Sequence, residues 1–288
     1  MKLAGKTLLC TLVLIIASIV GGAIVSSLPL KPPALPGAAS PGTAVAWMAL
    51  ASLVLVVGMV PIASGLGGRF SVRCLALIGL LYVANAVNGA IELSIFSTMG
   101  GERFLLVHFL VCFVATGAAL AWLFGSPERV PTMPRVVVPS WAWRVVVAWL
   151  AFPIIYLVFG MCVAPFVVGH YQAGELGLRL PPMAVILRTQ LLRSLLFLAC
   201  SLPVIRLWTG SRWRLIFALG MAHAVMVGLY GLSQAYFMPS VLRVAHSLEI
   251  IADSFAYAFV LGWLFFPVTR TAAARETPVP ISSTPTAA

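Results

Sequence analysis

Eight long apolar runs constrain this chain more than any other feature of its sequence. Each run reaches or exceeds the roughly 20 residues that a helix needs to cross the hydrocarbon core of a bilayer. Short segments rich in Pro, Gly and Arg separate the runs. The predicted spans cover residues 7–28, 43–63, 72–97, 104–124, 142–167, 182–207, 213–237 and 241–267. The pattern therefore predicts an all-α, polytopic integral membrane protein of about eight transmembrane helices.

The composition excludes a soluble domain. Of the 288 residues, 61% are hydrophobic and 9% are charged, and the mean hydropathy is +1.07. Soluble globular chains carry about 25% charged residues, because polar groups must cover their surface. Long continuous apolar runs also indicate helices rather than barrel strands, in which apolar and polar residues alternate over about ten positions. We therefore expect a lipid bilayer as the surrounding of this chain.

The basic residues predict how the helices are oriented. With the N-terminus inside, twelve of the eighteen Lys and Arg residues but two of the seven Asp and Glu residues fall on the cytoplasmic side. Cytoplasmic loops of membrane proteins carry such an excess of Lys and Arg. We expect an inner-membrane protein with both termini in the cytoplasm. We expect no nucleic-acid partner, because the cations are scattered at helix ends rather than gathered on one face.

A shift of 142 positions aligns the second half of the chain with the first. It places Pro61 on Pro203 and Glu92 on Gln234. Each half then contains four spans, and two copies with an even number of crossings share one orientation in the membrane. Two tandem four-helix repeats are one interpretation of this match. The other is chance, because apolar helices align easily and the identities are few.

The duplication suggests four segments along the chain. Residues 1–124 are a first four-helix membrane unit and residues 142–267 a second. Residues 125–141 are a Pro-rich cytoplasmic linker, whose prolines favour an extended spacer. Residues 268–288 are a disordered cytoplasmic tail, because they contain Ala, Thr, Ser and Pro without an apolar face.

Ionisable and amide side chains inside the spans are the candidate functional residues. A charge at the bilayer centre costs about 2.5–3.5 kcal/mol on insertion scales, so such groups are expected to face protein or water. Asn85, Asn88 and Glu92 are spaced i, i+3, i+7 and are predicted to share one helix face. The eighth span repeats this spacing with three polar residues. The candidate ligand-binding residues are Asn88, Glu92, Arg188, Arg193, Gln234, His246, Glu249 and Asp253.

Two interpretations fit these residues. In the first, they surround an outward-open polar cavity, where Arg188 and Arg193 pair with carboxylates and keep donors for a small polar, anionic, zwitterionic or lipid-like ligand. In the second, they are hydrogen bonds and salt bridges between helices of a non-catalytic membrane subunit or scaffold. Other membrane proteins are then the expected partners. Arg103 and Arg243 lie at loop edges, where we expect solvent to surround them.

Enzymatic chemistry is the third interpretation. His246 and Glu249, at i, i+3, place an imidazole and a carboxylate on one face, as acid and base of an intramembrane enzyme. No nucleophile motif and no further metal-ligand motif accompanies the pair, so we expect no metal and no cofactor and favour a protein without enzymatic activity. His223 is interpreted as a hydrogen-bonded core histidine.

Prolines and glycines predict local breaks. Pro153 and Pro165 in the fifth span and Pro203 in the sixth are expected to kink or interrupt their helices. Residues 64–69 contain three glycines and are predicted to form a flexible inner turn.

Overall fold

The computed structural model of the protein describes residues 2–34, 37, 40–126, 128–129 and 138–266. Within these residues the structure consists of helices and three isolated β-bridges. Eight helical segments are long and apolar enough to cross a membrane. The eight predicted helical segments are therefore confirmed.

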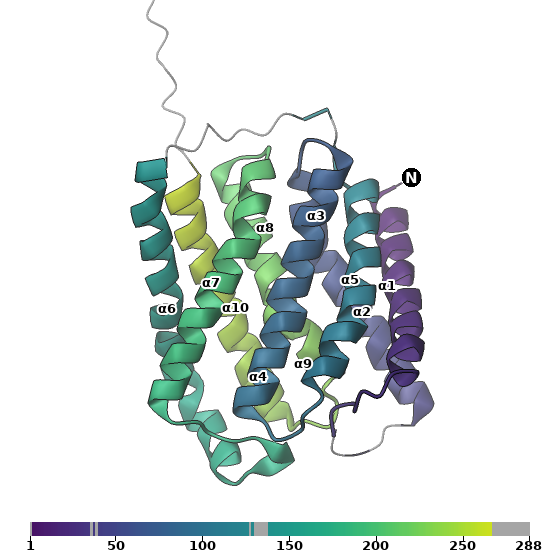
Figure 1. The fold of residues 1–288 in the computed structure, drawn as a ribbon, viewed down its shortest axis with the longest axis vertical. Coiled ribbons are helices and arrows are strands. Elements are labelled where there is room, and N and C mark those ends of the chain that lie inside the picture. The colour runs from purple at the N-terminus through teal and green to yellow at the C-terminus, as the bar shows by residue number, and fades with distance from the viewer. Residues whose placement is uncertain (1, 35–36, 38–39, 127, 130–137, 267–288) are drawn as a thin grey trace, which may run out of the picture.

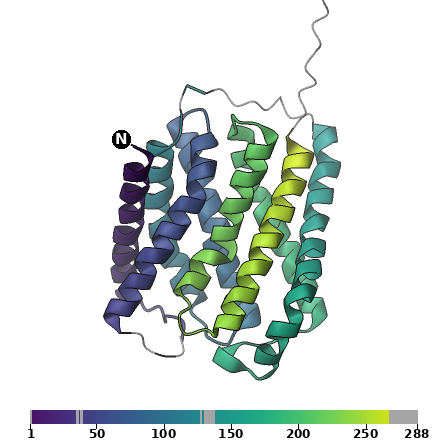
Figure 2. The same cartoon turned by 180° about the vertical axis from the view of Figure 1, so that it is seen from behind.

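The eight segments run up and down in one bundle (Figures 1 and 2). The beginning of the first segment and the end of the last one lie at the same end, which we call the terminal end, and the opposite end is the distal end. A 3-10 helix, η2 (Glu175–Gly177), lies in the distal loop after the fifth segment. The segments are α1 (Leu3–Ser26); α2 (Pro41–Gly65); α3 (Phe70–Leu81), π-helix η1 (Tyr82–Val87) and α4 (Asn88–Phe96); α5 (Glu102–Leu123); α6 (Val138–Gln172); α7 (Met183–Leu207); α8 (Arg212–Ala224), π-helix η3 (Val225–Leu229) and α9 (Tyr230–Gln234); and α10 (Ser240–Phe265).

Helix α6 differs most from its predicted bounds. It is 35 residues long and continues through Pro153 and Pro165. A proline removes one helix hydrogen bond, but ending the helix in apolar surroundings would leave several backbone groups unpaired. Helix α6 also includes the last residues of the predicted linker. Residues 130–137 and the predicted tail lie outside the described residues.

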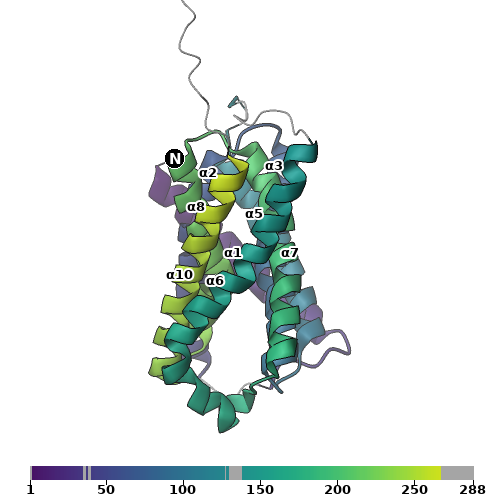
Figure 3. The same ribbon diagram turned by 90° about the vertical axis from the view of Figure 1, so that its left-hand side faces the viewer.

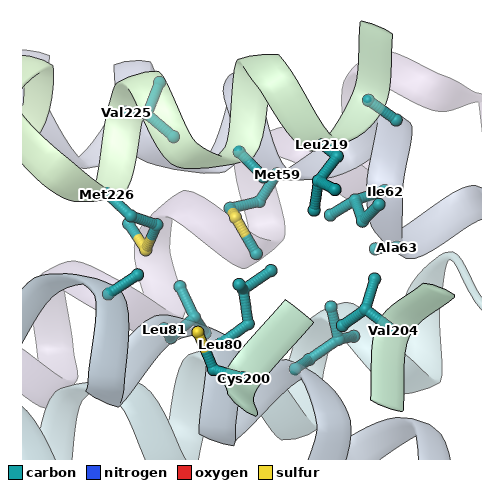
Figure 4. Packing of buried hydrophobic residues seen from close by; sticks show 14 of the residues in the cluster. Met59, Ile62, Ala63, Leu80, Leu81, Cys200, Val204, Leu219, Val225 and Met226 are labelled. Carbon is teal, nitrogen blue, oxygen red and sulfur yellow. The ribbon is translucent and has the colours of Figure 1, made fainter. Parts of the chain in front are cut away.

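Four of the segments form the centre of the bundle. Helix α2 packs against α8, and α3 packs against α7, while α1 and α5 flank one side and α6 and α10 the other. Figure 4 shows the core between the central segments, where Ile62, Leu80, Val204 and Leu219 come from four different helices and are fully buried. The apolar faces of these helices are therefore used against one another.

Apolar side chains also cover the outside of the bundle. Leu75 and Met161 are about 70% exposed, and Trp122 and Trp213 are more than half exposed near the terminal end. Trp208, in the connection between α7 and α8, is by contrast only 3% exposed. It is buried because its ring packs against Gly65, where a Cβ would overlap it.

The two connections at the terminal end pair with each other. Leu66 and Trp208 form an isolated antiparallel bridge, flanked by two backbone hydrogen bonds of 2.9 Å. The donors and acceptors are Gly67 N to Leu207 O and Thr209 N to Gly65 O. The predicted flexible turn is thus anchored to the connection between α7 and α8.

Adding a methyl group at Gly58 should destabilise the protein. A Cβ at Gly58 would overlap the Val225 side chain, whereas a Cβ at Gly79 has nothing within 4 Å. Overpacking a core costs about 1–3 kcal/mol, and alanine otherwise favours a helix by about 0.5–1 kcal/mol over glycine. We predict a lower melting temperature for Gly58→Ala and an equal or higher one for Gly79→Ala, measured in the same detergent. Equal melting temperatures for the two variants would contradict this packing.

Candidate functional site

A buried arginine organises the polar residues inside the bundle. Arg193 lies ten residues after the start of α7, about 15 Å along the helix axis, and only 3% of it is exposed. Its Nε donates to Asn88 Oδ1 over 2.7 Å, and its Nη1 donates to Gln190 Oε1 over 3.0 Å. Its Nη2 lies 2.5 Å from Glu92 Oε1. All three guanidinium nitrogens therefore contact oxygen atoms of the protein.

The π-helical segment η1 determines which residues reach this arginine. Asn88 is the first residue of α4, directly after η1, and Glu92 follows one turn later. Asn85, inside η1, donates instead to Met226 O of η3 over 2.7 Å. Asn85, Asn88 and Glu92 were expected to act as one face. They do not, because a π-helix bonds i to i+5 and changes the register of the side chains.

Helix α6 supplies an aromatic wall beside Arg193. The guanidinium lies 5.8 Å from the ring centroid of Phe152 and 5.7 Å from that of Tyr156, and Phe197 of α7 is at 5.6 Å. Ring faces attract cations. Trp149 Nε1 also donates to Leu191 O over 2.9 Å, which connects α6 to α7. These contacts hold the Arg193 side chain at the interface between α6 and α7.

Two further carboxylates approach the cluster from α10. Glu249 and Asp253 are each only 8% exposed, and Tyr156 is within electrostatic range of both, as well as of Arg193 and Glu92. Glu249 Oε2 lies 3.0 Å from His246 Nδ1. The site therefore holds three carboxylates and one arginine, together with one histidine that is charged only when protonated.

Several buried polar atoms of this cluster have no partner among the described residues. They include two donors beside Arg193, namely Asn88 Nδ2 and Gln190 Nε2, and two atoms on α10, namely Asp253 Oδ1 and the Tyr257 hydroxyl. An unpaired buried polar group costs about 1–3 kcal/mol. Amide donors on the α4 and α7 side and a carboxylate oxygen on the α10 side thus lack a partner within the described part of the chain.

The elements that carry the cluster separate toward the distal end. Figure 3 shows the ribbons of α6 and α7 close together near the middle of the bundle and diverging toward that end. The Glu92 side chain is 36% exposed, unlike the Arg193 side chain that it pairs with. The carboxylate therefore lies on the accessible side of the ion pair.

Two of the eight predicted residues do not join the Arg193 cluster. Arg188 is exposed and makes no ion pair with any described residue. Gln234 donates to Tyr230 O within its own segment over 3.3 Å. Neither Tyr156 nor Tyr257 was among the residues predicted from the sequence. A tyrosine inside an apolar span is the signal for both, because its hydroxyl needs a partner.

His223 forms the core hydrogen bond that its surroundings suggested. Its Nε2 lies 3.0 Å from Ser201 Oγ, and the two residues are 2% and 0% exposed. A serine beside a histidine is the arrangement of an activated nucleophile. Both groups are enclosed by the core, so this pair connects α7 to α8.

No group of three or more His, Cys, Asp or Glu residues within the described ranges is arranged to hold a metal ion. Comparison of the chain with protein-family models, with curated proteins and with solved structures gives no match.

Removing the carboxylate of Glu92 should destabilise the protein more than removing an exposed one. Breaking a fully buried pair costs about 3–5 kcal/mol, and the partial exposure of Glu92 reduces this to about 1–3 kcal/mol for Glu92→Gln. Glu175 makes an exposed contact of 2.5 Å with His170, so Glu175→Gln should cost about 0–1 kcal/mol. Unfolding in detergent measures both, and equal losses would contradict the role given to Glu92.

Proposed function

We propose that this protein is a multi-pass inner-membrane protein that binds, and moves across the membrane, a small zwitterionic solute at the Arg193 cluster. The observation that supports this proposal is a buried cluster in which protein partners occupy every nitrogen of the arginine, while two amide donors and one carboxylate oxygen beside it have no partner among the described residues. Such polar groups inside membrane-spanning segments mark substrate or ion pathways by default.

The charge balance supports a zwitterion over a simple anion. Arg193 and Glu92 neutralise each other, which leaves Glu249 and Asp253 against a single histidine. A purely anionic ligand would add negative charge to this surplus. A ligand with an ammonium group can approach the α10 carboxylates, and its oxyanion can accept from the unpaired amides of Asn88 and Gln190.

The surface of the bundle supports the membrane location and the orientation. Apolar side chains are exposed over its length, and exposed tryptophans gather near the terminal end. The basic residues at that end include Lys6 and Arg212, which donate to the last carbonyls of α5 and α10 over 2.6 Å. Cations are favourable at helix C-termini and on the cytoplasmic side. We assign the terminal end to the cytoplasm.

The element bounds support the tandem duplication. Several helix bounds of the second half repeat those of the first at an offset of 142 residues, although α1 and α6 differ at both ends. The matching starts are Pro41 and Met183, and Phe70 and Arg212; the matching ends are Gly65 and Leu207, and Leu123 and Phe265. Leu66 and Trp208, which form the bridge, are separated by the same offset, so a two-fold axis between them exchanges their two hydrogen bonds. Transporters built from parallel repeats place binding sites near the interface between repeats.

One observation favours a second candidate, a non-catalytic membrane subunit. Asn88, Gln190 and Glu92 already supply Arg193 with oxygen acceptors. In that case the cluster only stabilises the packing of the helices against one another. A measurement of ligand binding decides between the two candidates.

Reporter fusions test the orientation. A fluorescent protein fused after residue 288 should fluoresce and alkaline phosphatase fused there should be inactive, because the terminal end is assigned to the cytoplasm. Fusions truncated after residue 174, in the distal loop, should give the reverse result. Active phosphatase at the C-terminus would contradict the assignment.

Matched ligands test the binding function. Purified protein in detergent is titrated with L-leucine, with 4-methylpentanoate, which lacks the ammonium group, and with 3-methylbutylamine, which lacks the carboxylate. We expect the zwitterion alone to raise the melting temperature, with about 2.7 kcal/mol of stabilisation at 100 times its Kd. Asp253→Asn should abolish this rise, and Glu175→Gln should retain it.

The outcomes separate the candidates. Stabilisation by 4-methylpentanoate as large as that by L-leucine would support an anionic ligand instead. An absence of stabilisation across all neutral amino acids would support the structural role instead.

A further inference from the structure

A cavity lies on the other face of the bundle, away from Arg193. Figure 2 shows α2, the α8–α9 segment and α10 side by side on this face. A cavity of about 440 Å³ opens between them toward the distal end, within the range of about 300–1,000 Å³ that is usual for ligand sites. Its lining includes Val54 of α2, Leu229 of η3, and Val244 and Leu248 of α10.

The cavity is open to the side rather than to the end of the bundle. Val244 is 58% exposed and Leu248 is 62% exposed, and both line it. An apolar groove with this opening faces the region that lipid chains occupy when the helices span a bilayer. Hydrocarbon can therefore enter it without passing through water.

Four polar residues line this groove, namely Ser233 near the end of α9 and Ser240, Arg243 and Ser247 near the start of α10. The Nε of Arg243 is buried without a partner, and the guanidinium forms no ion pair with any residue that the structure describes. Solvent was expected around this side chain, whereas the side chain is half-buried against the groove.

The start of α10 adds to the positive potential at this point. Pro239 precedes the helix, no side chain caps its first turn, and no acidic residue lies in that turn. The first N–H groups of a helix attract anions, phosphates in particular. Arg243 lies in the same turn of α10. Its guanidinium, which has no ion-pair partner among the described residues, and the uncapped backbone donors therefore occur together beside the apolar lining of the groove.

We propose that this groove binds an anionic glycerophospholipid, with its phosphate at Arg243 and one acyl chain along Val54, Leu229 and Leu248. The occupant follows from the two parts of the site. Charge complementarity calls for an anion at the distal part, and the lateral apolar walls call for hydrocarbon attached to it. This inference rests on the membrane location proposed above, but not on the ligand of the Arg193 cluster.

The membrane location is measured first. The full-length protein should stay in the membrane fraction after carbonate extraction, and release by carbonate would contradict the membrane location itself rather than the lipid site.

Native mass spectrometry then tests the lipid. Dioleoyl phosphatidylglycerol is titrated onto delipidated protein in detergent, and the bound fraction is compared among variants. We expect about tenfold weaker binding for Arg243→Gln and no change for Arg103→Gln, which removes an exposed arginine at the same end. Leu248→Trp, which fills the groove without changing charge, should weaken binding as much.

Each result has a defined meaning. Equal effects of Arg243→Gln and Arg103→Gln would overturn the proposal, because they would indicate general attraction of anionic lipid. Displacement of the lipid by glycerol 3-phosphate alone would overturn it in favour of a soluble anion. Unchanged binding in Leu248→Trp would exclude the groove as the path of the acyl chain. Melting temperatures of all variants show whether each one is folded.

Discussion

The burial of one positive charge determines the arrangement of the distal half of the bundle. Arg193 lies deep in a helix whose surroundings are apolar, and a desolvated guanidinium is stable only with oxygen acceptors on its nitrogens. Those acceptors come from α4 and from α7 itself, and the aromatic wall comes from α6. Helices from both halves of the chain must therefore meet at this point, and the carboxylates of α10 are brought beside it.

The terminal half is held by a different interaction. There the connection after α2 and the connection after α7 form a backbone bridge between Leu66 and Trp208. The central apolar cluster packs next to this bridge. Between the two regions, η1 and η3 face each other through the hydrogen bond from Asn85 to Met226. π-helical segments occur frequently at functional sites. In the proposed duplication η1 and η3 are equivalent segments. They lie between the terminal end, where the bridge connects the two halves, and the distal end, where α6 and α7 diverge.

The two proposed sites differ in chemistry and in access. The Arg193 cluster is rich in carboxylates and lies between the two halves, which suits a small solute that enters from the distal end. The Arg243 groove has one unpaired cation and apolar walls on the outer face, which suits a lipid that enters from the side. A single exposed carboxylate near Arg243 would have cancelled its attraction for phosphate, and none lies in its helical turn.

The sequence by itself determined the number and order of the long apolar helices, because hydropathy is a local property of the chain. It also indicated that Glu92 and Arg193 needed partners, because the cost of a buried charge does not depend on the fold. The tertiary structure decided which partners they have. Arg193 joined the cluster and Arg188 did not, although both lie on α7, because the direction of a side chain depends on how helices pack. The change of register at η1, the burial of Trp208 against Gly65 and the lateral groove beside Arg243 likewise depend on contacts between residues far apart in the chain, which no local pattern records.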